Sequence, residues 1–199
     1  MKNKITIPGI IVTILATVFF SWGIYQLIYI ADYPQKITDN DILNNEIEAF
    51  INLKSIISAQ DKFYTKDLDE NGVKNYAEFL PHLWIYARKG IEPLELKLIS
   101  EEIAFSKSSH DGYKGYIYTN LHKKQIKPDE LEDINYEKEW AVIAYPKSMN
   151  ITGKLIFIAN NDNEIFAKKN VYNTKLYPTA PEKYGWVRIS SEDDVRRAF

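Results

Sequence analysis

The sequence predicts an α+β protein, in which an N-terminal transmembrane helix precedes a long amphipathic helix packed against a roughly four-stranded antiparallel sheet. Three observations lead to this fold class. Residues 5–31 carry no charged side chain, apolar residues recur at helical spacing across residues 41–67, and strand-like segments dominate residues 112–170. Because the helical and strand-like parts are segregated along the chain, the strands are expected to form a sheet against one face of the helix.

The uncharged segment between Lys4 and Asp32 is long enough to cross a membrane. Its 27 residues, 5–31, would form a helix of about 40 Å, which exceeds the ~30 Å thickness of the hydrocarbon layer. The alternative is a cleaved signal peptide, which has an apolar region of about 7–15 residues and small residues at its cleavage site. The best candidate site, residues 29–31, begins with the bulky Tyr29, so the sequence favours an uncleaved anchor.

The charges that flank this segment predict its orientation. Lys2 and Lys4 precede it, whereas Asp32, Asp39 and Asp41 follow it. Because positive residues concentrate on the cytoplasmic side of a membrane, the N-terminus is expected in the cytoplasm and the remainder outside. The predicted organisation is a transmembrane anchor over residues 1–31, which contacts lipid through residues 5–31, a juxtamembrane linker over residues 32–40, and an extracytoplasmic domain over residues 41–199.

The composition excludes several functional classes. The formal net charge is −2 and there is no cysteine. A mildly acidic chain of mixed charge lacks the basic surface that binds nucleic acid. Without thiols there are no disulfides, thiolate nucleophiles or cysteine metal sites. The sequence also lacks glycine-rich phosphate-binding patterns, so nucleotide binding has no support.

Helix and strand signals follow one another along the domain. The helix over residues 41–67 has one apolar face, formed by Leu43, Ile47, Phe50, Leu53, Ile57 and Tyr64. The four strand candidates are residues 112–121, 139–147, 153–160 and 164–170. Asn and Asp residues separate the last two, which should therefore form a hairpin. The charged segment 123–138 is expected to be an exposed connection, and the aromatic segment 171–190 to lie across the domain surface.

Several short segments match, in order, those of one known group. They are Ser58-Ala59-Gln60 with Phe63 and Tyr64, Tyr76-Ala77 with Phe79 and Leu80, residues 112–116, residues 141–146, and Thr152-Gly153 with residues 157–158 and 163–165. Over residues 47–168 the chain resembles the type IV pilin and pseudopilin group. The resemblance implies a bacterial inner-membrane protein with a pilin-like periplasmic head. Such a protein is not an enzyme and acts by protein–protein contact, as an accessory or structural subunit of an envelope complex.

The membrane segment departs from the pattern of that group. Prepilins resemble one another at a Gly followed by an apolar residue, with Glu four places after that residue. Gly9-Ile10 could correspond to the first part, but the Glu position is Ile14 and residues 5–31 hold no acid. A carboxylate inside a membrane helix is costly and has a dedicated partner. Its absence predicts a pilin-like head on a permanent anchor rather than a filament-forming subunit.

A calcium-loop pattern follows the long helix. Residues 67–78, DLDENGVKNYAE, fit D-x-[DN]-x-[DN]-G-x5-E. Ca²⁺ takes six to eight oxygen ligands, which alternate residues of a curling loop can supply, and Gly72 permits the sharp bend. The predicted metal ligands are Asp67, Asp69, Asn71, the Val73 carbonyl, Asn75 through a water, and Glu78.

A helix-ending turn explains the same residues without a metal. Gly72 would adopt a left-handed conformation, while Asp and Asn side chains would accept hydrogen bonds from local N–H groups. Lys74 occupies a loop position that is normally apolar. The sequence leaves both interpretations open, and a bound Ca²⁺ would be held weakly, with a Kd on the order of 10⁻⁴–10⁻³ M.

No other motif predicts catalysis. His82, His110 and His122 lack the spacing of metal-binding histidines, and residues 108–111 contain triad residue types only as sequence neighbours. We therefore expect a non-enzymatic membrane-anchored protein with protein partners. The alternative is a calcium-binding extracytoplasmic module that binds a ligand or acts as a sensor.

Overall fold

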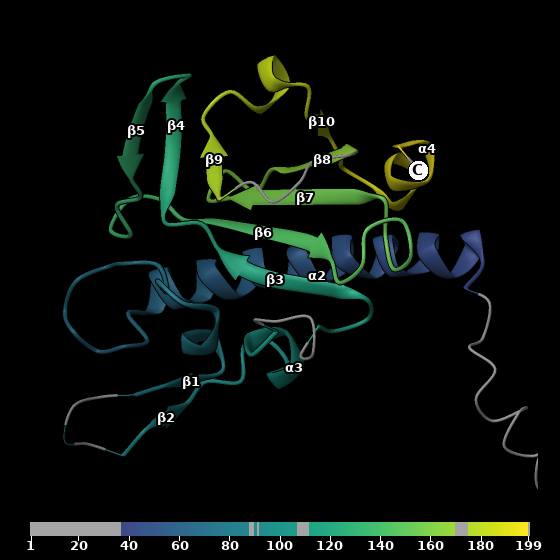
Figure 1. Cartoon of the computed structure of the whole chain (residues 1–199). Coiled ribbons are helices and arrows are strands. Elements are labelled where there is room, and N and C mark those ends of the chain that lie inside the picture. Colours follow the sequence, from purple (N-terminus) through teal and green to yellow (C-terminus); the bar gives the residue numbers. More distant parts are fainter. Residues whose placement is uncertain (1–36, 88–89, 91, 107–111, 170–174, 199) are drawn as a thin grey trace, which may run out of the picture. The chain divides into compact units, whose positions relative to one another are not determined.

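The computed structural model describes residues 37–87, 90, 92–106, 112–169 and 175–198 (Figure 1). The predicted anchor, residues 1–31, lies outside the described residues, as does most of the predicted linker. Within the described ranges, no helix combines the length and apolar character needed to cross a membrane.

Helix α2, Asp39–Lys66, is the longest element, with 28 residues. Thr38 begins it with a capping box: the Thr38 hydroxyl accepts from the Asp41 N–H, and the Asp41 carboxylate accepts from the Thr38 N–H at 2.8 Å. Asp67 ends it in a left-handed conformation. The apolar stripe predicts this helix correctly, since Ile47, Phe50 and Leu53 are all buried.

In the part of the chain that the structure describes, ten strands form three sheets. The five-stranded sheet has the order β10-β8-β7-β6-β3, and the three-stranded sheet β5-β4-β9 contains the parallel pair β4–β9. Strands β1 and β2 form a separate two-stranded ladder. The strands are Ile85–Tyr86, Leu94–Glu95, Tyr116–Asn120, Lys123–Lys127, Glu130–Asp133, Ala141–Pro146, Leu155–Asn160, Ile165–Lys169, Leu176–Pro178 and Val187–Arg188 for β1 to β10. The remaining helical elements are η1 (Leu80–Leu83), α3 (Glu101–Ala104), η2 (Pro181–Tyr184) and α4 (Glu192–Ala198).

The predicted fold class is therefore wrong. In place of the expected α+β arrangement, a long helix on one roughly four-stranded antiparallel sheet, the described residues form a β-rich domain of ten strands in three sheets. The transmembrane helix that was part of the same prediction falls on residues that the structure does not describe. The segment 123–138, expected to be an irregular connection, contains the β4–β5 hairpin, and the aromatic tail contributes β9 and β10. These strands are only two to five residues long, β5 and β10 are fully exposed and β4 has no buried residue, so the segments show little apolar alternation.

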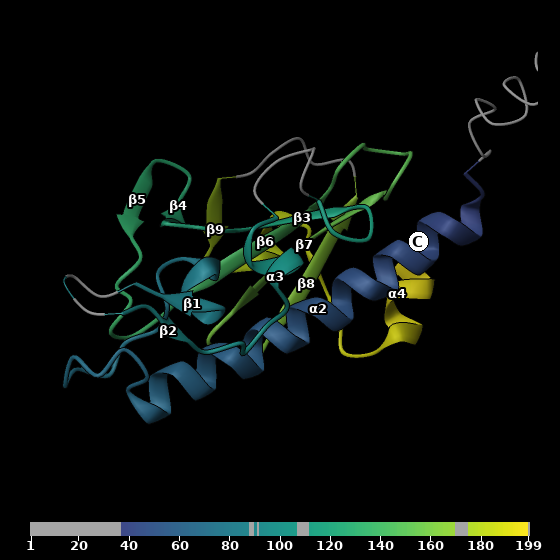
Figure 2. The ribbon, with the colours of Figure 1, turned by 90° about the horizontal axis from the view of Figure 1, so that it is seen from below.

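The five-stranded sheet is covered on both faces. One apolar cluster joins α2 residues such as Phe50 and Leu53 to Tyr118 and Phe157. The other cluster, on the opposite face, includes Ile143 and Ile158 with side chains from the three-stranded sheet and the C-terminal segment. Burial of both faces explains why all six residues of β7 are buried. Figure 2 shows α2 running along the sheet, with α4 beside its N-terminal half.

Candidate functional site

The acidic turn of residues 67–78 begins where α2 ends. Asp67 adopts a left-handed conformation (φ 47°), and its N–H donates to the Phe63 carbonyl. Glu70 (φ 54°) and Gly72 (φ 79°) are also left-handed, which bends the chain sharply after the helix. The turn therefore starts at a fixed point on the most regular element of the domain.

Polar side chains in the turn converge on one another. The Gly72 N–H donates to Asp67 Oδ2 at 3.1 Å. Asp69 Oδ2 accepts from the side-chain amides of Asn71 at 2.7 Å and Asn75 at 3.3 Å. Three of the predicted metal ligands, Asp69, Asn71 and Asn75, are thus bonded to one another, whereas the Asp67 carboxylate bonds the Gly72 N–H of the same turn.

Two carboxylate oxygens of this network have no hydrogen-bond partner. Oδ1 of Asp67 and Oδ1 of Asp69 are both buried and accept no hydrogen bond. Asp69 is only 5% exposed, so water does not solvate it freely. An unpartnered buried polar group costs about 1–3 kcal/mol, and more when it is charged. The turn therefore holds two neighbouring acids whose free oxygens suit a cation.

The predicted twelfth ligand does not complete the loop. After Val73 the chain runs without helix, because the Tyr76 N–H donates to the Tyr136 carbonyl at 2.8 Å and Gln60 bonds both polar groups of Ala77. Glu78 is exposed, and η1 begins only at Leu80. Over the described ranges, no group of three or more His, Asp or Glu residues is arranged to hold a metal ion. The six-position arrangement expected from the sequence is therefore only partly assembled.

The described histidines lie in an aromatic cluster. The Phe79 ring lies 5.3 Å from that of His82 and 5.4 Å from that of His122. The Tyr136 hydroxyl lies 2.8 Å from His122 Nδ1, and burial raises the pKa of this phenol far above its ordinary value, so the hydroxyl stays protonated. These contacts are those of packed rings. His110 and residues 108–111 lie outside the described residues.

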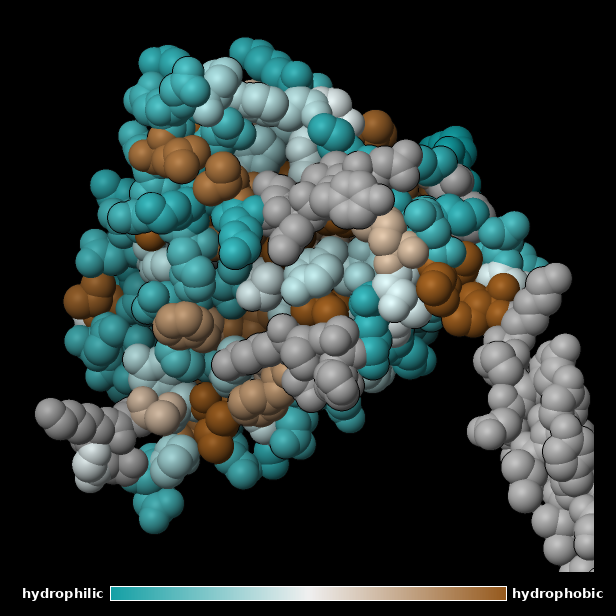
Figure 3. Space-filling view, in the orientation of Figure 1, coloured by the Kyte–Doolittle hydropathy of each residue, from teal (hydrophilic) through white to brown (hydrophobic). Residues whose placement is uncertain are grey.

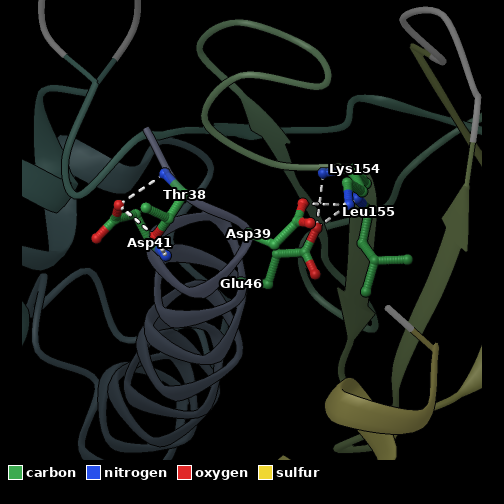
Figure 4. A network of polar contacts seen from close by, with 6 residues as sticks. All are labelled: Thr38, Asp39, Asp41, Glu46, Lys154 and Leu155. Carbon is green, nitrogen blue, oxygen red and sulfur yellow. Dashed lines mark hydrogen bonds and ion pairs between the residues drawn. The ribbon is translucent and has the colours of Figure 1, made fainter. Parts of the chain in front are cut away.

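Sequence reasoning missed one buried acid. Glu46, on α2, is fully buried, and its Oε1 accepts from the Lys154 N–H at 2.6 Å and the Leu155 N–H at 2.9 Å (Figure 4). The position of Glu46 in the sequence is a signal of its burial, because residue 46 lies four residues after Ile42 and four before Phe50, within the apolar stripe. Two further unpartnered donors, Asn120 Nδ2 and Trp140 Nε1, are also buried.

The fold and the turn define a β-rich domain built on one long helix that ends in an acidic loop. Residues 31–184 match the family described as protein of unknown function (DUF2950), and this match covers more than three quarters of the chain. The chain belongs to that family. Comparison with curated proteins and with solved structures gives no match. The matched range includes α2, the acidic turn and most of the sheet, and ends before β10 and α4.

Proposed function

We propose that this protein is a non-enzymatic, membrane-tethered subunit that acts by protein–protein contact on the outer side of the bacterial inner membrane. The uncharged residues 5–31, preceded by Lys2 and Lys4, support the tether and its orientation. The observation that carries the contact function is an exposed strand at the edge of the three-stranded sheet.

Strand β5 provides this edge. All four of its residues, Glu130–Asp133, are exposed, and Leu131 is 49% exposed. Within the described part of the chain, β5 pairs with β4 alone, so its other side can accept a further strand. Figure 1 shows the β4–β5 hairpin standing away from the five-stranded sheet. An extended segment of a partner protein would add to the sheet at this edge.

The hairpin is held in shape by cross-strand ion pairs. Lys127 Nζ lies 2.8 Å from a Glu130 carboxylate oxygen, and Lys124 Nζ lies 3.4 Å from one of Glu132. Exposed pairs of this kind contribute little individually, at most about 1 kcal/mol. They leave acidic side chains along the strand that a partner would approach, which favours a basic or neutral partner strand.

Photo-crosslinking in native membranes tests the contact. A photoreactive residue at Leu131 in the full chain should give one dominant protein adduct. The matched control is Val187, which is 59% exposed and lies on β10, one of the two edge strands of the five-stranded sheet within the described residues. Equal adducts from both positions, or none from Leu131, would reject β5 as the contact edge.

A second proposal is that the acidic turn binds Ca²⁺. The unpartnered oxygens of Asp67 and Asp69 favour it, since a divalent cation would satisfy both. Asn71 and the Val73 carbonyl are further oxygen donors, and water would complete the coordination in place of Glu78. Such a site would stabilise the C-terminal end of α2.

Thermal unfolding of the full chain in detergent tests calcium binding. At ten times Kd, Ca²⁺ would stabilise the fold by about 1.4 kcal/mol, raising Tm by roughly 3–6 °C. Asp69→Asn should abolish this shift. Glu70→Gln removes the same charge from the same turn outside the ligand pattern and should retain it. An equal response in both variants would exclude the site.

A further inference from the structure

Two exposed isoleucines lie near the point where the chain enters the described domain. Ile37 is 45% exposed and directly precedes α2, and Ile151 is 53% exposed in the connection between β6 and β7. We call this connection, residues 147–154, the β6–β7 loop. Figure 3 shows hydrophobic surface beside the position where the chain leaves the described region. Single exposed apolar residues are common, so the argument rests on how the loop is held.

The β6–β7 loop is fixed to the first turns of α2. The Asn45 side-chain amide donates to the Thr152 carbonyl at 3.0 Å. Glu46 accepts from the N–H groups of Lys154 and Leu155, and Lys154 Nζ lies 3.0 Å from Asp39 Oδ1 (Figure 4). The loop is thus held by Asp39, Asn45 and Glu46, all within the first eight residues of α2. Its tip therefore keeps a constant position beside the start of the helix.

Internal bonds also give the loop a defined shape. The Asn150 N–H donates to the Gly153 carbonyl at 2.7 Å, and the Ser148 N–H donates to the Thr152 hydroxyl at 2.9 Å. Asn150 is left-handed (φ 64°), a conformation that tight turns use and that Asn tolerates. Ile151 is therefore displayed at the tip of an ordered turn.

The linker length limits how far this tip can lie from the membrane. Residues 32–36 separate the uncharged segment from Ile37. At a maximum of about 3.6 Å per residue, they span roughly 20 Å. The headgroup layer on each side of the hydrocarbon is on the order of 5–8 Å thick. With residues 5–31 in the membrane, as the proposed function holds, the start of α2 could lie no farther than this from the end of the uncharged segment.

We infer that Ile37 and the tip of the β6–β7 loop contact the phospholipid headgroup layer of the membrane that holds the tether. This inference rests on the membrane tether of the proposed function. Apolar side chains that enter the interface are removed from water, which is favourable in proportion to the apolar area that they bury. The contact would fix the orientation of the domain. In Figures 1 and 2 the β4–β5 hairpin lies at the opposite end, where it would face away from the lipid.

The absence of cysteine allows a direct test. Single-cysteine variants Ile151→Cys and Leu131→Cys of the full chain are labelled with an environment-sensitive fluorophore and reconstituted into vesicles of phosphatidylethanolamine and phosphatidylglycerol. The label at position 151 should emit at shorter wavelength and be quenched several-fold by headgroup spin-labelled lipid. The label at position 131 should be quenched by aqueous iodide instead. Equal iodide quenching at both positions would overturn the lipid contact.

A carbonate wash separates failure of this inference from failure of the tether. If the labelled chains leave the vesicles on washing, the tether itself is rejected. If they remain and the label at position 151 still behaves like that at position 131, only the lipid contact is rejected. A protein adduct formed by a photoreactive residue at position 151 in native membranes, in place of lipid adducts, would also overturn it.

Discussion

The two ends of α2 each carry a buried carboxylate, and the two are bonded differently. Near the N-terminal end, the Glu46 carboxylate accepts hydrogen bonds from the backbone N–H groups of Lys154 and Leu155, where β7 begins. At the C-terminal end, Asp69 receives two side-chain amides from its own turn. Each acid leaves its second oxygen unpartnered, but only Asp69 lies in a turn with another such acid, Asp67. One end thus joins helix to sheet, whereas the other places two acids with buried, unpartnered oxygens in a single turn.

Removing the Glu46 side chain should produce the largest effect. Glu46→Ala leaves the N–H groups of Lys154 and Leu155 without their acceptor in a buried site, which should destabilise the domain by about 3 kcal/mol. Glu48→Ala, on the same helix but facing an exposed lysine, should cost less than about 0.5 kcal/mol. Urea unfolding of the full chain in detergent measures both. Similar losses of stability in the two variants would show that the buried bonds of Glu46 contribute no more than the exposed contact of Glu48.

A smaller loss should follow from Gly153→Ala, at the same end of the helix. The added Cβ would lie 2.3 Å from the Tyr116 hydroxyl, which donates to the Leu155 carbonyl at 2.8 Å. The clash should cost about 1–3 kcal/mol. In a Tyr116→Phe background the hydroxyl is absent but two ring carbons still lie 2.7 and 2.8 Å from the added Cβ, so the same substitution should cost less without becoming neutral. An unchanged loss of stability in the Tyr116→Phe background would show that the contact with the Tyr116 hydroxyl does not hold the loop.

At the C-terminal end of α2, Asp69→Asn should raise the stability of the domain rather than lower it when a chelator removes calcium. It replaces a buried charge beside Asp67 with a neutral amide and should stabilise the domain by about 1 kcal/mol. Glu70→Gln, the matched change, should be nearly neutral. Thermal unfolding in chelator decides between them. A loss of stability in Asp69→Asn would mean that the carboxylate is already satisfied without a cation.

The smallest effect should be a pH dependence from Glu46. Burial raises its pKa above the ordinary 4.5, against the opposing N–H groups of Lys154 and Leu155. Between pH 4.5 and this raised pKa the folded state binds more protons than the unfolded state. The stability that Glu46 contributes is therefore complete below pH 4.5 and decreases as pH rises through the raised value. Glu46→Gln should remove this slope, and an identical slope in both proteins would assign it to another group.

Local signals predicted part of the fold. The stripe through Ile47, Phe50 and Leu53 identified α2, and the Asn- and Asp-rich turn identified the β7–β8 hairpin. Strand β4, KKQIK, has one apolar residue and is stabilised by cross-strand pairs, while its parallel partner β9 lies about fifty residues away. Such pairings depend on tertiary contacts that periodicity does not report.

The acidic turn and Glu46 likewise divide into features that local sequence predicts and features that depend on tertiary contacts. Asp67, Asp69 and Asn71 meet because they are neighbours in one tight turn, which spacing alone predicts. Glu78 was expected on a following helix, but bonds from Tyr136 and Gln60 hold the chain in another course. The role of Glu46 was hidden because its partners are more than one hundred residues away.

The length of α2 sets a large distance between its capped start and the acidic turn. Twenty-eight residues at about 1.5 Å each separate the capped start of the helix from Asp67 by about 42 Å. Anionic headgroups concentrate divalent ions only within a screening distance of about 8–10 Å at ordinary ionic strength. If the start of the helix faces the lipid and the helix points outward, any cation bound by the turn would reflect the free ion concentration of the surrounding compartment. The lipid composition of the membrane would not affect it.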